Sequence, residues 1–136
     1  MKEKAFIMEI VFRSDRPLKE LSAQCSQIFE TQFVETDQFD EVPGHVAQIG
    51  EVELELMKAP DEHPTRESTL SIRARTELEI EDYVATLPAI FREIFVSKPV
   101  NSRGFIECSE ELQNAFLARG FSDCISCLLF DLKYDE

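Results

Sequence analysis

Two segments of this chain alternate strictly between apolar and polar residues, and that pattern limits the fold more than any other. Residues 51–56 read Glu-Val-Glu-Leu-Glu-Leu, and residues 70–80 place an apolar or small side chain at every second position. A period of two predicts strands with one face on a core and the other in water. Only a proline-containing stretch, 58–68, separates them. We therefore expect the two strands to pair antiparallel.

The alternation also predicts a register. If Met57 lies opposite Thr69, then Glu55 faces Ser71, Glu53 faces Arg73 and Glu51 faces Arg75. Opposite charges facing one another across a strand pair contribute about 0.2–1 kcal/mol each. On this register, part of the glutamate ladder is neutralised by the neighbouring strand.

Helical spacing of three and four residues appears elsewhere in the chain. It predicts helices over residues 17–31, over 83–95 with a kink or a late start at Pro88, and from Ser109 through Arg119. Ser109 is the expected N-cap of the last helix, and Gly120 is its expected left-handed end, with Phe121 folding back onto the last turn. Further strands are predicted at 5–12, 105–108 and 123–134, with a short strand and a loop within 32–44.

Together these elements predict one α+β domain over residues 1–136. We expect a single mainly antiparallel sheet of about 5–6 strands with about three helices, in the order βα(β)ββαβαβ. A chain of 136 residues with 43% hydrophobic residues can bury a core of its own.

The charge balance limits the classes of partner. The chain carries 14 basic and 27 acidic side chains, a net charge of −13. Proteins that bind nucleic acid or anionic membranes place Lys and Arg against phosphates, so we expect neither partner. No signal peptide and no apolar run of membrane-spanning length is found in the sequence. The sequence therefore predicts a cytoplasmic protein whose cysteines are reduced thiols.

The acidic residues are unevenly distributed. Residues 35–62 hold nine acids and one lysine, and a second group follows the alternating strand at 77–82. Seven acids have no expected partner. Phe33 and Phe39 lie among acids, where burial is less easily achieved, so they are either interface anchors or, as is more common for aromatic residues, part of the core. Such a set either forms a surface for a basic partner or is a solvated face that keeps the protein in solution. The candidate partner-binding residues are Phe33, Asp37, Phe39, Asp40, Glu41, Glu77, Glu79, Glu81 and Asp82.

Residues with metal or catalytic chemistry are few. Cys124 and Cys127 have the spacing of a zinc or redox pair, but residues three apart in a strand point to opposite faces, so we interpret them as buried thiols. His45 and His63 lack an evident nucleophile or acid partner. The four glycines form no phosphate-binding motif. We expect no metal, no cofactor and no catalytic residue.

Three classes of function remain open. The favoured hypothesis is an acidic binding or inhibitor protein that neutralises a basic protein partner, such as a bacterial immunity protein or an antitoxin against a nuclease toxin. No motif supports this beyond the general profile of such proteins. The first alternative is a small α+β enzyme or ligand-binding domain with a carboxylate in a pocket. The second is a self-associating subunit that pairs through an exposed edge strand. The oligomeric state, monomer or homodimer, is left open.

Overall fold

The structure, a computed structural model, describes residues 3–13, 16–36, 44–58, 67–95 and 104–126. These residues form seven strands and four helices around one sheet, which confirms the predicted α+β class. The elements in chain order are β1 (Lys4–Phe12), α1 (Leu18–Ile28), β2 (Val34–Thr36), β3 (Gly44–Ile49), β4 (Val52–Lys58), β5 (Ser68–Thr76), α2 (Ile80–Val84), α3 (Ile90–Ile94), β6 (Phe105–Glu107), α4 (Ser109–Leu117) and β7 (Cys124–Ser126).

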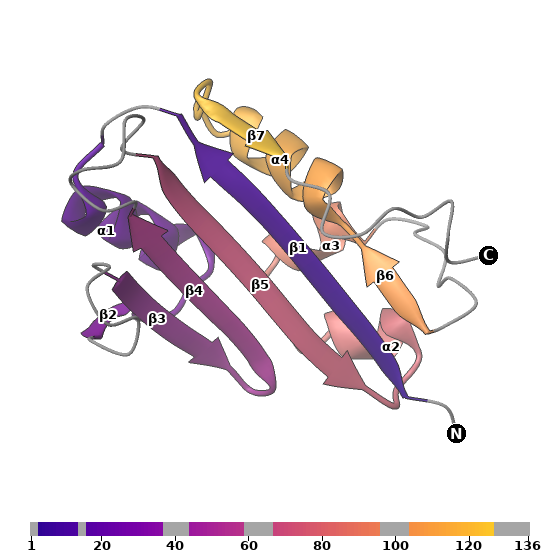
Figure 1. The fold of residues 1–136 in the computed structure, drawn as a ribbon. Coiled ribbons are helices and arrows are strands. Elements are labelled where there is room, and N and C mark those ends of the chain that lie inside the picture. Colours follow the sequence, from indigo (N-terminus) through magenta and orange to yellow (C-terminus); the bar gives the residue numbers. More distant parts are fainter. Residues whose placement is uncertain (1–2, 14–15, 37–43, 59–66, 96–103, 127–136) are drawn as a thin grey trace.

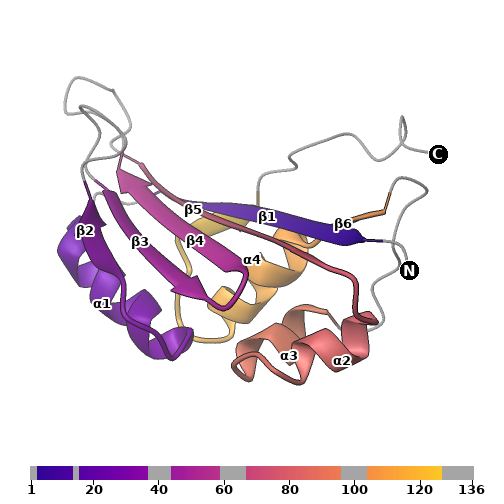
Figure 2. The ribbon, with the colours of Figure 1, turned by 90° about the horizontal axis from the view of Figure 1, so that it is seen from below.

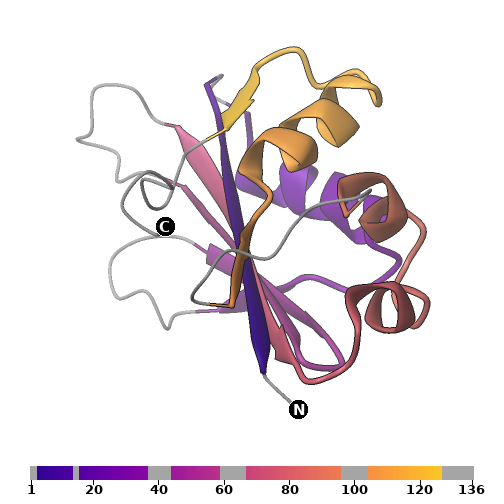
Figure 3. The same cartoon turned by 90° about the vertical axis from the view of Figure 1, so that its right-hand side faces the viewer.

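The sheet has the strand order β2-β3-β4-β5-β1-β6, and β7 pairs with β1 beside β6 (Figure 1). Every pair is antiparallel except β1 with β6. All four helices cover one face of the sheet, and no described helix lies on the opposite face (Figures 2 and 3). The protein is therefore a two-layer arrangement in which one sheet face meets helices and the other does not.

The predicted register of the two alternating strands is confirmed over most of its length. Met57 pairs with Thr69, Glu55 with Ser71 and Glu53 with Arg73. Arg73 contacts both glutamates, with its Nε at 3.1 Å from Glu53 Oε2 and an Nη2 at 3.4 Å from Glu55 Oε2. The glutamate ladder is therefore partly neutralised by the neighbouring strand, as expected.

The predicted contact between Glu51 and Arg75 is wrong. β4 begins at Val52, because Gly50 and Glu51 form the turn from β3, where Gly50 adopts a left-handed φ of 59°. Arg75 instead contacts Glu3, with its Nη1 at 3.7 Å from Glu3 Oε1. The turn therefore removes Glu51 from the ladder.

The Glu53–Arg73 pair gives a measurable prediction. Both side chains are more than half exposed, at 56% and 58%, so solvent screens their attraction. A double-mutant cycle with Glu53→Gln and Arg73→Gln is expected to give a coupling energy of about 0.2–1 kcal/mol, measured by urea unfolding. The same cycle between Glu53 and the distant Arg119 should give no coupling, and equal values for the two cycles would contradict the register argument.

The core lies between the sheet and the helices. Alternate residues of β1, β4 and β5 point into it, as their two-residue period predicts. Its aromatic part centres on Phe116, whose ring centroid lies 5.6 Å from that of Phe12, 6.0 Å from Phe29 and 5.1 Å from Phe121. Packing of these rings joins β1, the end of α1 and α4.

Three details bear on the sequence predictions. Of the two readings of Phe33, core residue or interface anchor, the structure favours the core, because Phe33 is buried at 4% exposure and its ring lies 6.4 Å from that of Phe29. Ser109 does not cap α4: Cys108 precedes the helix, and Ser109 is its first residue. The third difference is β3, which the sequence analysis did not predict, because Gly44–Ile49 lacks a clear apolar alternation.

Other element predictions are largely confirmed. The predicted interruption at Pro88 is confirmed, because α2 ends at Val84 and α3 begins at Ile90, and proline cannot donate a helical hydrogen bond. The predicted start at residue 83 is wrong, since α2 begins at Ile80. Gly120 has a left-handed φ of 93°, and the Phe121 amide donates to the Phe116 carbonyl at 3.1 Å. The predicted strand 123–134 is described only for Cys124–Ser126, and its remainder lies outside the described residues.

Candidate functional site

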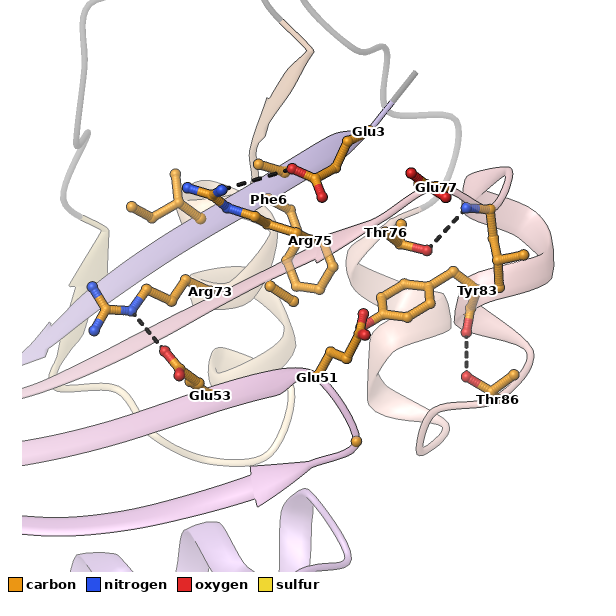
Figure 4. Close-up of a pocket in the computed structure, with 15 residues that line it drawn as sticks. Glu3, Phe6, Glu51, Glu53, Arg73, Arg75, Thr76, Glu77, Tyr83 and Thr86 are labelled. Atoms are coloured by element: carbon orange, nitrogen blue, oxygen red, sulfur yellow. Dashed lines mark hydrogen bonds and ion pairs between the residues drawn. The ribbon is translucent and has the colours of Figure 1, made fainter. Parts of the chain in front are cut away.

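A cavity of about 1110 Å³ lies where the end of β5 and the start of β1 approach the β3–β4 turn and α2 (Figure 4). Its apolar lining includes Phe6, Ala74 and Tyr83, which are all buried. Its polar lining includes Arg73 and Arg75 of β5 and the glutamates Glu3, Glu51, Glu53 and Glu77, which come from four segments. The site therefore combines an apolar floor with a charged rim.

Tyr83 contributes an unusual group to this cavity. The side chain is 7% exposed, and its buried hydroxyl has no hydrogen-bond partner among the residues that the structure describes. The ring extends from α2 toward Glu51, whose carboxylate lies beside it (Figure 4). Burial, and then the Glu51 carboxylate, raise the pKa of Tyr83 above its usual value. The hydroxyl thus stays protonated at neutral pH, as both a donor and an acceptor.

The two arginines of the lining are already matched by acids. Arg73 contacts Glu53, and Arg75 contacts Glu3, all within the same lining. Glu51 and Glu77 form no ion pair with any residue that the structure describes. The uncompensated charge around the cavity is therefore negative.

A group of exposed acids continues this negative charge along the loop after β5 and into α2. We call Glu77, Glu79, Glu81 and Asp82 the acidic cluster. Glu81 and Asp82 lie in the first turn of α2. Lys4 reaches the same loop, with its Nζ at 3.9 Å from Glu79 Oε1 and donating to the Leu78 carbonyl at 3.3 Å. Within the described ranges, Glu79 is the member of the cluster that contacts a cation.

The structure brings together only part of the predicted partner-binding set. The acidic cluster lies beside the cavity, next to α2, whereas Phe33 packs into the core next to β2, at the far edge of the sheet (Figure 1). Asp37, Phe39, Asp40 and Glu41 lie outside the described residues. The structure thus places the candidate acids at 77–82 and does not describe those between 37 and 41.

Two residues of the site were not among the predicted site residues. The sequence analysis treated Glu51 as a member of the glutamate ladder and Tyr83 as the first apolar residue of a helix. The signal that separates Tyr83 from an ordinary core residue is its hydroxyl, which needs a partner when buried. Only the tertiary structure, which brings α2 near the β3–β4 turn, shows that no described residue supplies this hydrogen-bond partner.

The cysteines and the described histidine add no second site. Cys25, Cys108 and Cys124 are buried free thiols. Burial raises the pKa of Cys25 to about 12 and, with Asp123, raises that of Cys124. His45 lies on β3 opposite Leu56, and Cys127 and His63 are outside the described residues. No group of three or more His, Cys, Asp or Glu side chains in the described ranges is arranged to hold a metal ion.

The helices and the comparisons with other proteins add two findings. Among the described helices, none has the length and apolar character needed to cross a membrane. No protein-family model, no curated protein and no solved structure matches the chain.

Proposed function

We propose that this protein is a cytoplasmic binding protein that neutralises a basic protein partner, in the manner of a bacterial immunity protein or an antitoxin against a nuclease toxin. The observation that supports the proposal is the position of Glu77, Glu81 and Asp82. These exposed carboxylates form no ion pair among the described residues. Glu77 lines the cavity together with Tyr83, whose buried hydroxyl has no partner in the described part of the chain, and Glu81 and Asp82 directly precede Tyr83 in α2. A partner with cationic side chains would provide ion pairs for the carboxylates and a hydrogen bond for the Tyr83 hydroxyl.

The charge distribution supports binding at this end of the sheet. On β4 and β5, Arg73 contacts both Glu53 and Glu55 and so offsets part of their negative charge. In the acidic cluster, Glu79 contacts Lys4, and the other three acids form no ion pair with any residue in the described ranges. A focused negative potential of this kind raises the association rate of a basic partner by roughly 10- to 1000-fold. Binding here would then occlude the partner's own anion-binding surface.

Charge reversal tests this proposal. The variant Glu81→Lys with Asp82→Lys changes the net charge from −13 to about −9, since each substitution adds two charges. We expect association with the basic partner to slow by about tenfold and to depend less steeply on salt. The partner is first recovered by affinity purification from the native host and identified by mass spectrometry. Association is then measured by stopped-flow fluorescence with the purified partner.

A matched control separates the site from the overall charge. Glu20 and Glu110 are also exposed and also lie in the first turn of a helix, α1 and α4 respectively. The variant Glu20→Lys with Glu110→Lys therefore has the same net charge and the same change at helix N-termini. Equal slowing in both variants would mean that only net charge matters, and unaltered association in the first would refute this site. Failure to recover any basic protein would refute the function.

The same cavity also suits the alternative of a small ligand-binding domain or enzyme. Its volume of about 1110 Å³ is slightly above the range for small-molecule sites, about 300–1000 Å³, and it combines apolar walls with a few polar groups. This alternative predicts that a small cationic compound raises the Tm of the isolated protein while no basic protein is retained from the host.

A further inference from the structure

We infer that the cavity beside α2 receives an arginine side chain of the basic partner, with Glu51 as its ion-pair acceptor and the Tyr83 hydroxyl as a hydrogen-bond partner. This inference rests on the proposed function and names the group that would anchor the partner. It is carried by two independent features, the uncompensated acids of the rim and the buried hydroxyl without a partner.

The shape and lining of the cavity fit a long side chain with a charged end. The buried residues Phe6 and Ala74 form apolar floor, against which the methylene stem of an arginine can pack. Glu51 and Glu77 stand on the lining from two different elements, the β3–β4 turn and the loop after β5. Glu51 lies beside the Tyr83 ring, and Glu77 lies farther away, beyond Thr76, so Glu51 is the acid next to Tyr83 (Figure 4).

The existing ion pairs leave room for one more cation. Arg73 and Arg75 have their charges matched by Glu53 and Glu3, at 3.1 and 3.7 Å. Neither of these contacts uses Glu51 or Glu77, which have no ion pair in the described part of the chain. An incoming cation therefore need not break an ion pair that the structure contains.

The Tyr83 hydroxyl favours a ligand that can donate to it. A buried polar group without a partner is unfavourable, and a guanidinium that reaches it restores a hydrogen bond. Glu51 is exposed and lies in a turn, so its side chain can move with the incoming cation at small cost. The hydroxyl can then accept from the guanidinium and donate to the Glu51 carboxylate.

Arginine fits this arrangement better than lysine. The guanidinium presents five donors in a planar fork, which can contact a carboxylate and a hydroxyl at the same time. It is also more weakly hydrated than an ammonium group, so it enters an apolar-floored cavity more readily. The proposal therefore predicts discrimination between two cations of equal charge.

Short peptides test this directly on the full-length protein. The probes are Ac-Gly-Arg-Gly-amide, its lysine counterpart and its citrulline counterpart, which keeps the shape of arginine without the charge. In ¹⁵N-¹H NMR titrations the arginine peptide is expected to shift the amides of Thr76, Leu78 and Thr86 saturably, with an affinity about tenfold above that of the lysine peptide. The citrulline peptide is expected to give no saturable shift.

Two variants identify the contacts. Tyr83→Phe removes only the unpartnered hydroxyl, so we expect an unchanged or raised urea midpoint together with about tenfold weaker arginine-peptide binding. Glu51→Gln should also weaken binding, whereas Glu53→Gln, whose carboxylate already contacts Arg73, should have a smaller effect. This opposite change in stability and affinity for Tyr83→Phe would not arise from a purely structural role.

The outcomes separate this inference from the proposed function. If the citrulline peptide binds as well as the arginine peptide, if the shifts map elsewhere, or if no saturable shift occurs at millimolar peptide, the arginine site is wrong. The proposed function still stands in that case if reversal of Glu81 and Asp82 slows the basic partner. Conversely, a specific arginine site in a protein that retains no basic partner would contradict the proposed function alone.

Discussion

Replacing Phe116 with alanine is expected to lower the free energy of unfolding by about 3–5 kcal/mol. The ring is fully buried and contacts the rings of Phe12, Phe29 and Phe121, so its removal leaves a cavity that three different segments border. Those segments are held by the sheet and by α1, so they cannot all move inward to fill the space. Urea unfolding followed by circular dichroism measures the change.

Leu117→Ala is the matched control for this prediction. Leu117 is the next residue of the same helix, but its side chain is 42% exposed. Truncation there should change the free energy of unfolding by less than about 0.5–1 kcal/mol. Similar losses in the two variants would show that helix α4, and not the aromatic cluster, determines the effect.

Ser109→Ala is expected to lower the free energy of unfolding by about 1–3 kcal/mol. The Ser109 hydroxyl accepts the Glu9 amide of β1 at 2.8 Å, at the point where β6 has ended and β7 has not begun. Its own amide donates to Glu107 Oε1 at 2.5 Å, so the residue connects the start of α4 to the sheet. Alanine keeps the helix but leaves the Glu9 amide without this acceptor.

Ser22→Ala supplies the control, because Ser22 is also a buried helical serine, at 5% exposure, but lies in the middle of α1. Alanine has the higher helix propensity, so we expect little change or a small gain in stability there. Amide hydrogen exchange at Glu9 gives a second readout, and it should speed up in Ser109→Ala only. Unchanged exchange at Glu9 would contradict the role assigned to the hydroxyl.

The sequence predicts best those strands in which apolar and polar residues alternate along the whole strand. β4 and β5 alternate regularly and are neighbours in the chain, so their pairing, and the register from Met57–Thr69 to Glu53–Arg73, follow from one short connection. β3 has no such pattern, and its place in the sheet depends on hydrogen bonds to β2 and β4. A strand whose position depends on its neighbours need not show a clear apolar alternation in its own residues.

The candidate site divides in the same way. The acids from Glu77 to Asp82 are close in sequence, so their grouping follows from the sequence alone. Phe33 lies among acids in the sequence and is nevertheless buried against Phe29, because its neighbours in space are not those in the chain. The meeting of Tyr83 with Glu51 joins α2 to the β3–β4 turn, 32 positions apart, and no local pattern predicts it.

The sequence by itself determined the α+β class, the pairing of β4 with β5, the break at Pro88 and the excess of negative charge. Each of these depends on residues near one another in the chain, where side-chain period, backbone restriction and composition act directly. Only the tertiary structure decided that the Glu51 turn leaves the ladder, that Ser109 serves β1, and that a buried hydroxyl lies without a partner beside the acidic cluster. These features arise from contacts between distant segments, and their free energy depends on which polar groups folding brings together and which it leaves unsatisfied.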